Sequence, residues 1–182
     1  MSDRTTYLVL AGYENSGPEH WQTRWEEAEP EAFRRVQQAD WDRPEAGDWV
    51  ARVDAAVAEA AAQGPVVLVA HSLGCITAAR WVAGASAERT AAVRGALLVA
   101  PADIDNADVP VLAGFRPVAL APFPFPAVVV ASTDDPWVTT DRAREFAGAW
   151  GARFVEAGAH GHLNSASGLG DWPAGRELLA EL

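Results

Sequence analysis

Residues 66–75 read Val-Val-Leu-Val-Ala-His-Ser-Leu-Gly-Cys, and this stretch decides the fold. Its first five residues are apolar and rich in β-branched valine, which predicts one short buried strand. Residues 76–83 follow a helical pattern, so Ser72 falls at a tight turn between a strand and a helix. The positions two before and two after it are small, Ala70 and Gly74, as is required where two backbones nearly touch. This pattern predicts a serine whose Oγ projects from the sheet edge at a helix N-terminus, where a nucleophile would lie.

Length and composition are those of an ordinary globular chain. The 182 residues are 49% hydrophobic and 21% charged, which predicts one domain over residues 1–182. The formal net charge of −11 argues against a nucleic-acid partner, because phosphates would be repelled. Cys75 is the only cysteine, so an intrachain disulfide cannot form and a reducing compartment fits.

The sequence also indicates where the protein works. No apolar run approaches the roughly 18 residues that a membrane-spanning helix needs. Residues 1–6 are polar, and the apolar run after them is too short for a secretion signal. We therefore expect a cytoplasmic protein with no membrane partner. Composition does not indicate its oligomeric state.

Strands and helices alternate along the rest of the chain. We predict strands at residues 7–11, 33–38, 66–70, 96–100, 127–131 and 152–156, and helices at 19–29, 44–64, 76–83, 140–150 and 173–182. The strand at 33–38 is polar and is expected near a sheet edge. Alternation of this kind is typical of an α/β fold with a doubly wound, mostly parallel sheet and helices on both faces.

Residues 102–126 do not fit the alternation, because five prolines there exclude a regular helix or a central strand. Phe115, Phe123 and Phe125 favour a packed loop over a disordered one. We interpret the segment as a flap near the site of Ser72. It either lines an apolar acyl or aryl pocket or simply covers the end of the sheet.

Polar residues follow two later strands where each strand ends. Asp134 and Asp135 come after the strand at 127–131, and His160 and His162 come after the strand at 152–156. Because the carboxyl ends of parallel strands meet at one edge, an aspartate and a histidine should meet the serine there. The chain order serine, aspartate, histidine is that of hydrolases with a strand-turn-helix serine. In such a site an imidazole takes the serine proton and a carboxylate holds the imidazole.

One residue is preferred in each pair. His162, which follows a glycine and leads toward a helix, is the predicted base, with His160 as the alternative. Asp135 is the predicted acid, because Asp-Pro-Trp-Val turns the chain toward the next helix. Asp134 is expected to cap that turn. His71, adjacent to the serine, should point another way and act as a packed or hydrogen-bonded neighbour.

Two backbone N–H groups are needed to hold the negative charge that develops on the carbonyl oxygen. One is predicted at Leu73, where the helix after the serine begins. The other should lie in the loop after the first strand, where Gly12 allows a turn, and Tyr13 is the candidate. His20 and Trp21 follow this loop and either contact the site or have a structural role.

Four segments together resemble the small serine hydrolases related to retinoblastoma-binding protein nine. They are Gly12–Trp21, Ala70–Gly74, Ser132–Trp137 and Gly161–Gly168. The resemblance spans nearly the whole chain, with departures at Tyr13 and Leu163. It implies a compact α/β-hydrolase fold without a large cap domain and a triad of Ser72, Asp135 and His162. It implies no substrate.

The sequence therefore predicts a serine hydrolase that cleaves a small-molecule carboxylic ester, thioester or amide through an acyl-enzyme, without metal or cofactor. Two alternatives stay open. A metal-dependent hydrolase could use His160, His162 and the aspartate pair as ligands, although the strand-turn-helix serine would then have no purpose. A protein of this fold could also act by binding a partner. Residues 73–77 of this chain resemble the Leu-x-Cys-x-Glu motif of retinoblastoma-pocket ligands, but Thr77 stands where the motif has Glu. This difference argues against partner binding through the motif.

Overall fold

One parallel six-stranded sheet organises the computed structural model, which describes residues 4–182. The first three residues of the polar start lie outside the described residues. The strand order is β2-β1-β3-β4-β5-β6. The strands are β1 (Thr6–Leu10), β2 (Phe33–Arg35), β3 (Val66–His71), β4 (Val93–Val99), β5 (Ala127–Ala131) and β6 (Arg153–Glu156). The expected parallel sheet is confirmed, including the placement of the polar strand β2 at an edge.

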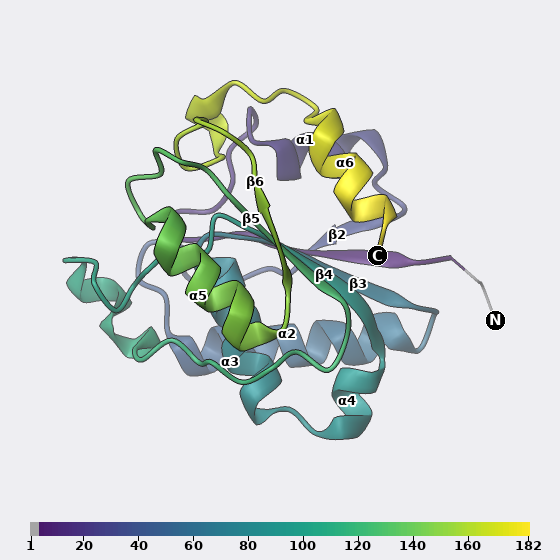
Figure 1. Ribbon diagram of the computed structural model, residues 1–182. Helices are drawn as coiled ribbons and strands as arrows, with labels where there is room; N and C mark the ends of the chain where they lie inside the picture. The colour runs from purple at the N-terminus through teal and green to yellow at the C-terminus, as the bar shows by residue number, and fades with distance from the viewer. Residues whose placement is uncertain (1–3) are drawn as a thin grey trace.

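Helices cover both faces of this sheet, and no large cap stands above it (Figure 1). The helices are α1 (Trp21–Ala28), α2 (Ala46–Ala61), α3 (Leu73–Gly84), α4 (Ala87–Ala91), α5 (Thr140–Trp150) and α6 (Pro173–Ala180). In Figure 1, α1 and α6 lie on one face, and α2, α3 and α5 lie on the other. Among residues 4–182, no helix is both long and apolar enough to cross a bilayer.

Two hydrophobic clusters fill the space between the sheet and these helix layers. Side chains alternate along the central strands, so Leu68 belongs to the cluster under α2, α3 and α5, while Val67 and Val69 belong to the cluster under α1 and α6. Leu68 pairs with Leu8 on one side and with Ala96 on the other. Burial on both faces is why these strands are continuous apolar runs rather than alternating ones.

The first residue of a helix differs from the predicted one where a side chain caps the helix N-terminus. Helix α1 begins at Trp21 rather than Glu19, because His20 is its N-cap and the His20 ring accepts the Gln22 N–H. Helix α4 was not predicted, since its five residues are too few for a hydrophobic period. It forms one turn capped by Ser86, whose side chain accepts the Arg89 N–H.

Residues 102–126 form a packed segment that contains a 3₁₀ helix, η1 (Pro110–Phe115). The proline at its first position fits, because that residue needs no N–H. Phe123 and Phe125 are buried and pack against each other, and Phe123 also packs against Trp150 of α5, with ring centroids 5.6 Å apart. Neither of these two rings borders the pocket beside Ser72. Leu112 is the residue of this segment that borders the pocket beside Ser72.

Phe123→Ala is expected to destabilise the protein by about 3–5 kcal/mol, the usual cost of removing a buried phenylalanine ring. Urea unfolding measures this loss. Relative rates on esters of different acyl length should stay unchanged in native buffer, because the ring lies away from the pocket. A changed acyl-length preference with unaltered stability would contradict this placement.

Candidate active site

Ser72 is the single residue between β3 and α3, as predicted for a sharp strand-to-helix turn. Its backbone has φ 55° and ψ −121°, a positive φ that is strained for a residue other than glycine. Its N–H donates to the carbonyl oxygen of Val99 in β4 (3.0 Å). A Cβ at Gly74 would lie 2.1 Å from the carbonyl oxygen of Leu10, so α3 can approach β1 only with glycine there. The local sequence thus forces the Ser72 side chain out above the sheet edge.

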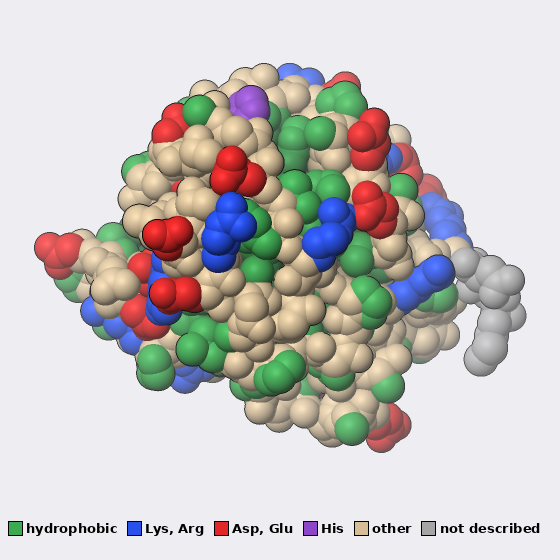
Figure 2. Space-filling model, viewed as in Figure 1, with side chains coloured by type: hydrophobic (Ala, Val, Ile, Leu, Met, Phe, Trp, Pro, Cys, Tyr) green, Lys and Arg blue, Asp and Glu red, His purple; other side chains and the backbone are tan. Residues whose placement is uncertain are grey.

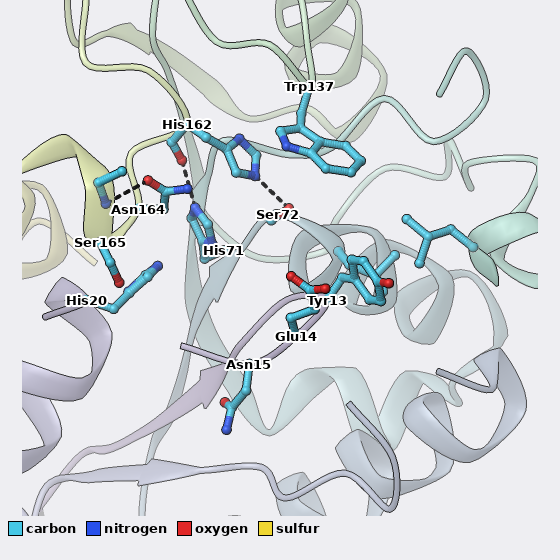
Figure 3. Close-up of a pocket in the computed structure, with 13 residues that line it drawn as sticks. Tyr13, Glu14, Asn15, His20, His71, Ser72, Trp137, His162, Asn164 and Ser165 are labelled. Carbon is cyan, nitrogen blue, oxygen red and sulfur yellow. Dashed lines mark hydrogen bonds between the residues drawn. The ribbon is translucent and has the colours of Figure 1, made fainter. Parts of the chain in front are cut away.

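The structure brings Ser72, His162 and Asp135 together in a hydrogen-bonded row. Nε2 of His162 lies 2.8 Å from Oγ of Ser72 (Figure 3). Nδ1 of the same ring lies 2.9 Å from both carboxylate oxygens of Asp135. The Asp135 side chain is completely buried, and its Oδ1 also accepts the Trp137 N–H (2.8 Å). This is the arrangement in which an imidazole can remove the serine proton while a carboxylate holds its other nitrogen.

A second aspartate holds the backbone of the loop that carries His162. Oδ1 of Asp134 accepts the Ser132 hydroxyl (2.8 Å) and the Gly161 N–H (2.7 Å). The Ser132 Oγ in turn accepts the His160 N–H (2.8 Å). These bonds, the Ser132 hydroxyl first, lower the pKa of Asp134. Asp134 was expected to bond only its own turn, and the structure corrects this because one of its partners belongs to the loop after β6.

His71 supports the same loop from the other side. Its Nε2–H donates to the carbonyl oxygen of His162 (2.8 Å), as expected of a hydrogen-bonded neighbour. Burial is the main reason that its pKa lies well below the ordinary value, and His20 and His162 add to this effect. The ring is therefore neutral and carries its proton on the nitrogen that donates.

His20, for which the sequence left open a site contact or a structural role, borders the pocket and also caps a helix. Nδ1 of His20 accepts the Gln22 N–H (3.2 Å), which caps α1. Burial lowers the pKa of His20 to about 3, with smaller contributions from Arg35 and His162. The His20 ring lies edge-on to that of His71, with centroids 4.6 Å apart.

These two buried neutral rings should make the protein less stable in mild acid. Below about pH 6.5 His20 and His71 bind protons in the unfolded chain, whereas in the folded chain both rings stay neutral until the pH is far lower. The free energy of unfolding should therefore fall from pH 7 to pH 5, by up to about 1.4 kcal/mol per pH unit for each proton. Urea unfolding at both pH values measures the slope. His20→Asn keeps a capping acceptor and should reduce it, and an unchanged slope would contradict the neutral state of His20.

Both predicted oxyanion donors border a pocket of about 340 Å³ that Ser72 also lines. Across residues 4–182, neither the Tyr13 nor the Leu73 amide donates to another protein group. A Cβ at Gly12 would lie 3.0 Å from Cβ of Ser72, so the loop after β1 passes directly beside the serine. Both amides are thus free to donate to a bound group.

Three polar residues that sequence reasoning missed fix this loop. Arg35 donates to Oδ1 of Asn15 (2.9 Å) and to the carbonyl oxygen of Ser16 (3.0 Å), and it is paired with Glu26. Gln22, fully buried, donates to the carbonyl oxygens of Leu10 and Val69 and accepts the Ser16 hydroxyl. Two features of the sequence could have indicated these contacts. Arg35 is a charged residue inside a short edge strand, and Gln22 is a polar residue between two tryptophans of α1.

The remaining candidates do not join this row. His160 is exposed and does not border the pocket that Ser72 lines. Throughout residues 4–182, no three or more histidine, cysteine, aspartate or glutamate side chains are grouped so that they could hold a metal ion. Both ring nitrogens of His162 face other residues, Ser72 and Asp135. Both nitrogens are therefore engaged in hydrogen bonds within the row.

Comparisons with known proteins concern the family and the fold. The family model described as serine hydrolase matches residues 7–181. No curated protein matches the chain in sequence. A protein described as a YdeN-like hydrolase from Pectobacterium atrosepticum superposes with a TM-score of 0.83 at 30% identity, covering 98% of this chain and 90% of that one.

Two further solved structures share the fold at lower identity. The ydeN gene product of B. subtilis has a TM-score of 0.72 at 20% identity, covering 98% of this chain and 97% of its own. Est1E from Butyrivibrio proteoclasticus, with ferulic acid bound, has a TM-score of 0.71 at 12% identity, covering 99% and 90%.

Proposed function

The chain belongs to the serine hydrolase family, and from this premise we propose that it cleaves a carboxylic ester, thioester or amide by an acyl-enzyme route. Ser72 is the proposed nucleophile, His162 the general base and acid, and Asp135 the residue that orients His162. The observation that carries the proposal is the unbroken row of hydrogen bonds from Asp135 through His162 to Ser72 at the edge of a pocket.

The proposed reaction has two half-reactions. Nε2 of His162 takes the proton of Ser72 as Oγ bonds to the substrate carbonyl carbon, and the carbonyl oxygen becomes an oxyanion. The N–H groups of Leu73 and Tyr13 hold that oxyanion. The intermediate collapses when His162 returns the proton to the leaving alcohol, thiol or amine, and an acyl-Ser72 ester remains. Water, deprotonated by His162, then attacks this ester and releases the acid and the free serine.

The substrate is proposed to be a small molecule with an ester, thioester or amide bond, and the reaction is proposed to need no cofactor. Residues 1–182 are proposed to form one domain. Est1E, which shares the fold, binds ferulic acid, a carboxylic acid of the product class that this route releases. Within the serine hydrolase family, the chain is proposed to group with proteins related to retinoblastoma-binding protein nine. A cytoplasmic location remains part of this proposal.

Partner binding through residues 73–77 is not favoured. All five of these residues are buried in the first turns of α3, so a partner could reach them only if the helix unfolded. The face shown in Figure 2 carries separated basic side chains among acidic ones. Neither feature marks a docking surface.

Labelling with a fluorophosphonate followed by mass spectrometry tests the proposed function directly. We expect one phosphonyl group on Ser72 and turnover of 4-nitrophenyl esters, fastest for the acyl length that suits the pocket. Absence of both labelling and turnover in the folded protein would overturn the proposal. Labelling at another serine would overturn the assignment of Ser72.

A further inference from the structure

His20 places an unused hydrogen-bond donor beside the pocket. Its Nδ1 accepts the Gln22 N–H, so the neutral ring carries its hydrogen on Nε2. Within residues 4–182 this Nε2–H has no acceptor, although the residue is only 3% exposed. A buried donor without a partner costs stability, and a ligand atom that accepts from it gains a strong hydrogen bond.

His71 supplies the complementary group. Its Nε2–H is used on the carbonyl oxygen of His162, so Nδ1 of the neutral ring is an acceptor. The two rings meet edge to face with centroids 4.6 Å apart, and both residues border the pocket of Ser72. One imidazole of the pair can therefore donate and the other can accept.

We propose that the His20–His71 pair binds a hydroxyl group on the alcohol half of the substrate, so that the preferred substrates are monoesters of diols or polyols. This inference rests on the proposed ester cleavage at Ser72. A hydroxyl group is both donor and acceptor, so it can satisfy the two rings at once. Burial keeps both rings neutral, and Glu14 on the pocket wall and the net charge of −11 disfavour a carboxylate or phosphate there.

The position of the pair indicates the alcohol half rather than the acyl half. His20, Asn164 and Ser165 lie on one side of Ser72, and Tyr13 and Trp137 lie on the other (Figure 3). The leaving alcohol must take its proton from His162, and Asn164 and Ser165, two and three residues after His162, line the same side of the pocket as His20. The side with Tyr13 and Trp137 then holds the acyl chain.

His20 and Ser165 share one wall of the pocket. Figure 3 draws both residues on the same side of Ser72. The Ser165 side chain is exposed and, in the described part of the chain, makes no hydrogen bond. The Ser165 hydroxyl is therefore free to bond a group that binds on this side of the pocket.

A matched pair of esters tests the inference. 2-Hydroxyethyl butyrate and n-propyl butyrate have the same acyl group and leaving groups of equal length, and they differ by a hydroxyl in place of a methyl. We expect wild-type kcat/KM to favour the hydroxyethyl ester by about 10- to 100-fold, after division by the ratio of their rates in hydroxide-catalysed hydrolysis, because the methyl leaves both rings unpaired.

Two substitutions at His20 separate the donor from the helix cap. His20→Asn keeps an oxygen that can accept the Gln22 N–H but loses the distal donor, so the preference should fall nearly to one. His20→Gln places an NH₂ group near the position of Nε2 but loses the cap, so part of the preference should return. Thermal unfolding of both variants reports the loss of the cap independently.

The outcomes distinguish this inference from the function on which it rests. If wild type cleaves both esters without preference, or if His20→Asn keeps the full preference, the hydroxyl site is wrong while ester cleavage stands. Fluorophosphonate labelling without cleavage of the hydroxyethyl ester also overturns the hydroxyl site. Failure of both labelling and cleavage overturns the proposed function itself.

A binding measurement covers the case in which His20→Asn does not fold. Ser72→Ala protein, labelled with ¹⁵N in histidine, is titrated with each ester. The Nε2 resonance of His20 should shift with 2-hydroxyethyl butyrate and not with n-propyl butyrate. The same response to both esters, or no response to either, overturns the inference.

Discussion

Ser72→Ala is expected to abolish fluorophosphonate labelling and to lower kcat on an activated ester by roughly a millionfold, the loss that follows removal of a serine nucleophile that acts as one unit with its base. The variant should fold. Only an oxygen is removed, so no new atom meets the loop after β1 at the point where Gly12 approaches Cβ of residue 72. Single-turnover and steady-state assays on 4-nitrophenyl acetate measure the loss, and circular dichroism checks the fold.

A matched control separates this effect from the loss of any serine. Ser86 caps α4 on the surface, away from the pocket, and Ser86→Ala should leave labelling and turnover at the wild-type level. A Ser72→Ala protein that still labels and still cleaves the ester would show that the serine at the turn is not the nucleophile.

Turnover should be sensitive to substitutions around His162, because several residues hold the loop that carries it. Ser132 and Asp134 bind the backbone N–H groups of residues 160 and 161, and His71 binds the carbonyl oxygen of His162. The ring itself contacts Asp135 and Ser72. Backbone and side chain are thus fixed by different residues, which holds the imidazole within the narrow range of positions that proton transfer needs.

Local pattern was sufficient to predict the fold and the residues that meet at the sheet edge. Val66–Ala70 and Ala127–Ala131 are apolar runs that only a doubly covered strand can bury, and parallel strands bring the residues after them to one edge. Ser72, Asp135 and His162 could therefore be predicted as neighbours although they are far apart in the chain.

Contacts that depend on side-chain direction could not be predicted in this way. Phe123 and Phe125 lie in a proline-rich segment near the site, and no period in that segment indicates which way the rings face. Phe123 packs against Trp150 of α5, and Phe125 packs against Phe123. The bonds from Gln22 to β1 and β3 likewise depend on the three-dimensional approach of α1 to two strand ends.

The second large effect is expected at Asp135, and the neighbouring aspartate provides its control. In Asp135→Asn, the amide oxygen can still accept the Trp137 N–H, so the loop should keep its shape. The amide NH₂ group cannot accept from Nδ1 of His162, which favours the ring tautomer with its hydrogen on Nε2. That tautomer cannot take the Ser72 proton, so kcat should fall by roughly 10⁴-fold.

Asp134→Asn should cost far less, about tenfold or below, because an amide oxygen can still accept both the Ser132 hydroxyl and the Gly161 N–H that Asp134 binds. The two variants carry the same chemical change one residue apart, so the difference between their rates reports the His162 contact and not the loss of a negative charge. Both are measured on one activated ester at neutral pH, with unfolding curves to show that each is folded. If Asp134→Asn is the crippled enzyme and Asp135→Asn is not, the acid that orients His162 is Asp134, and the row of hydrogen bonds through Asp135 is not the catalytic one.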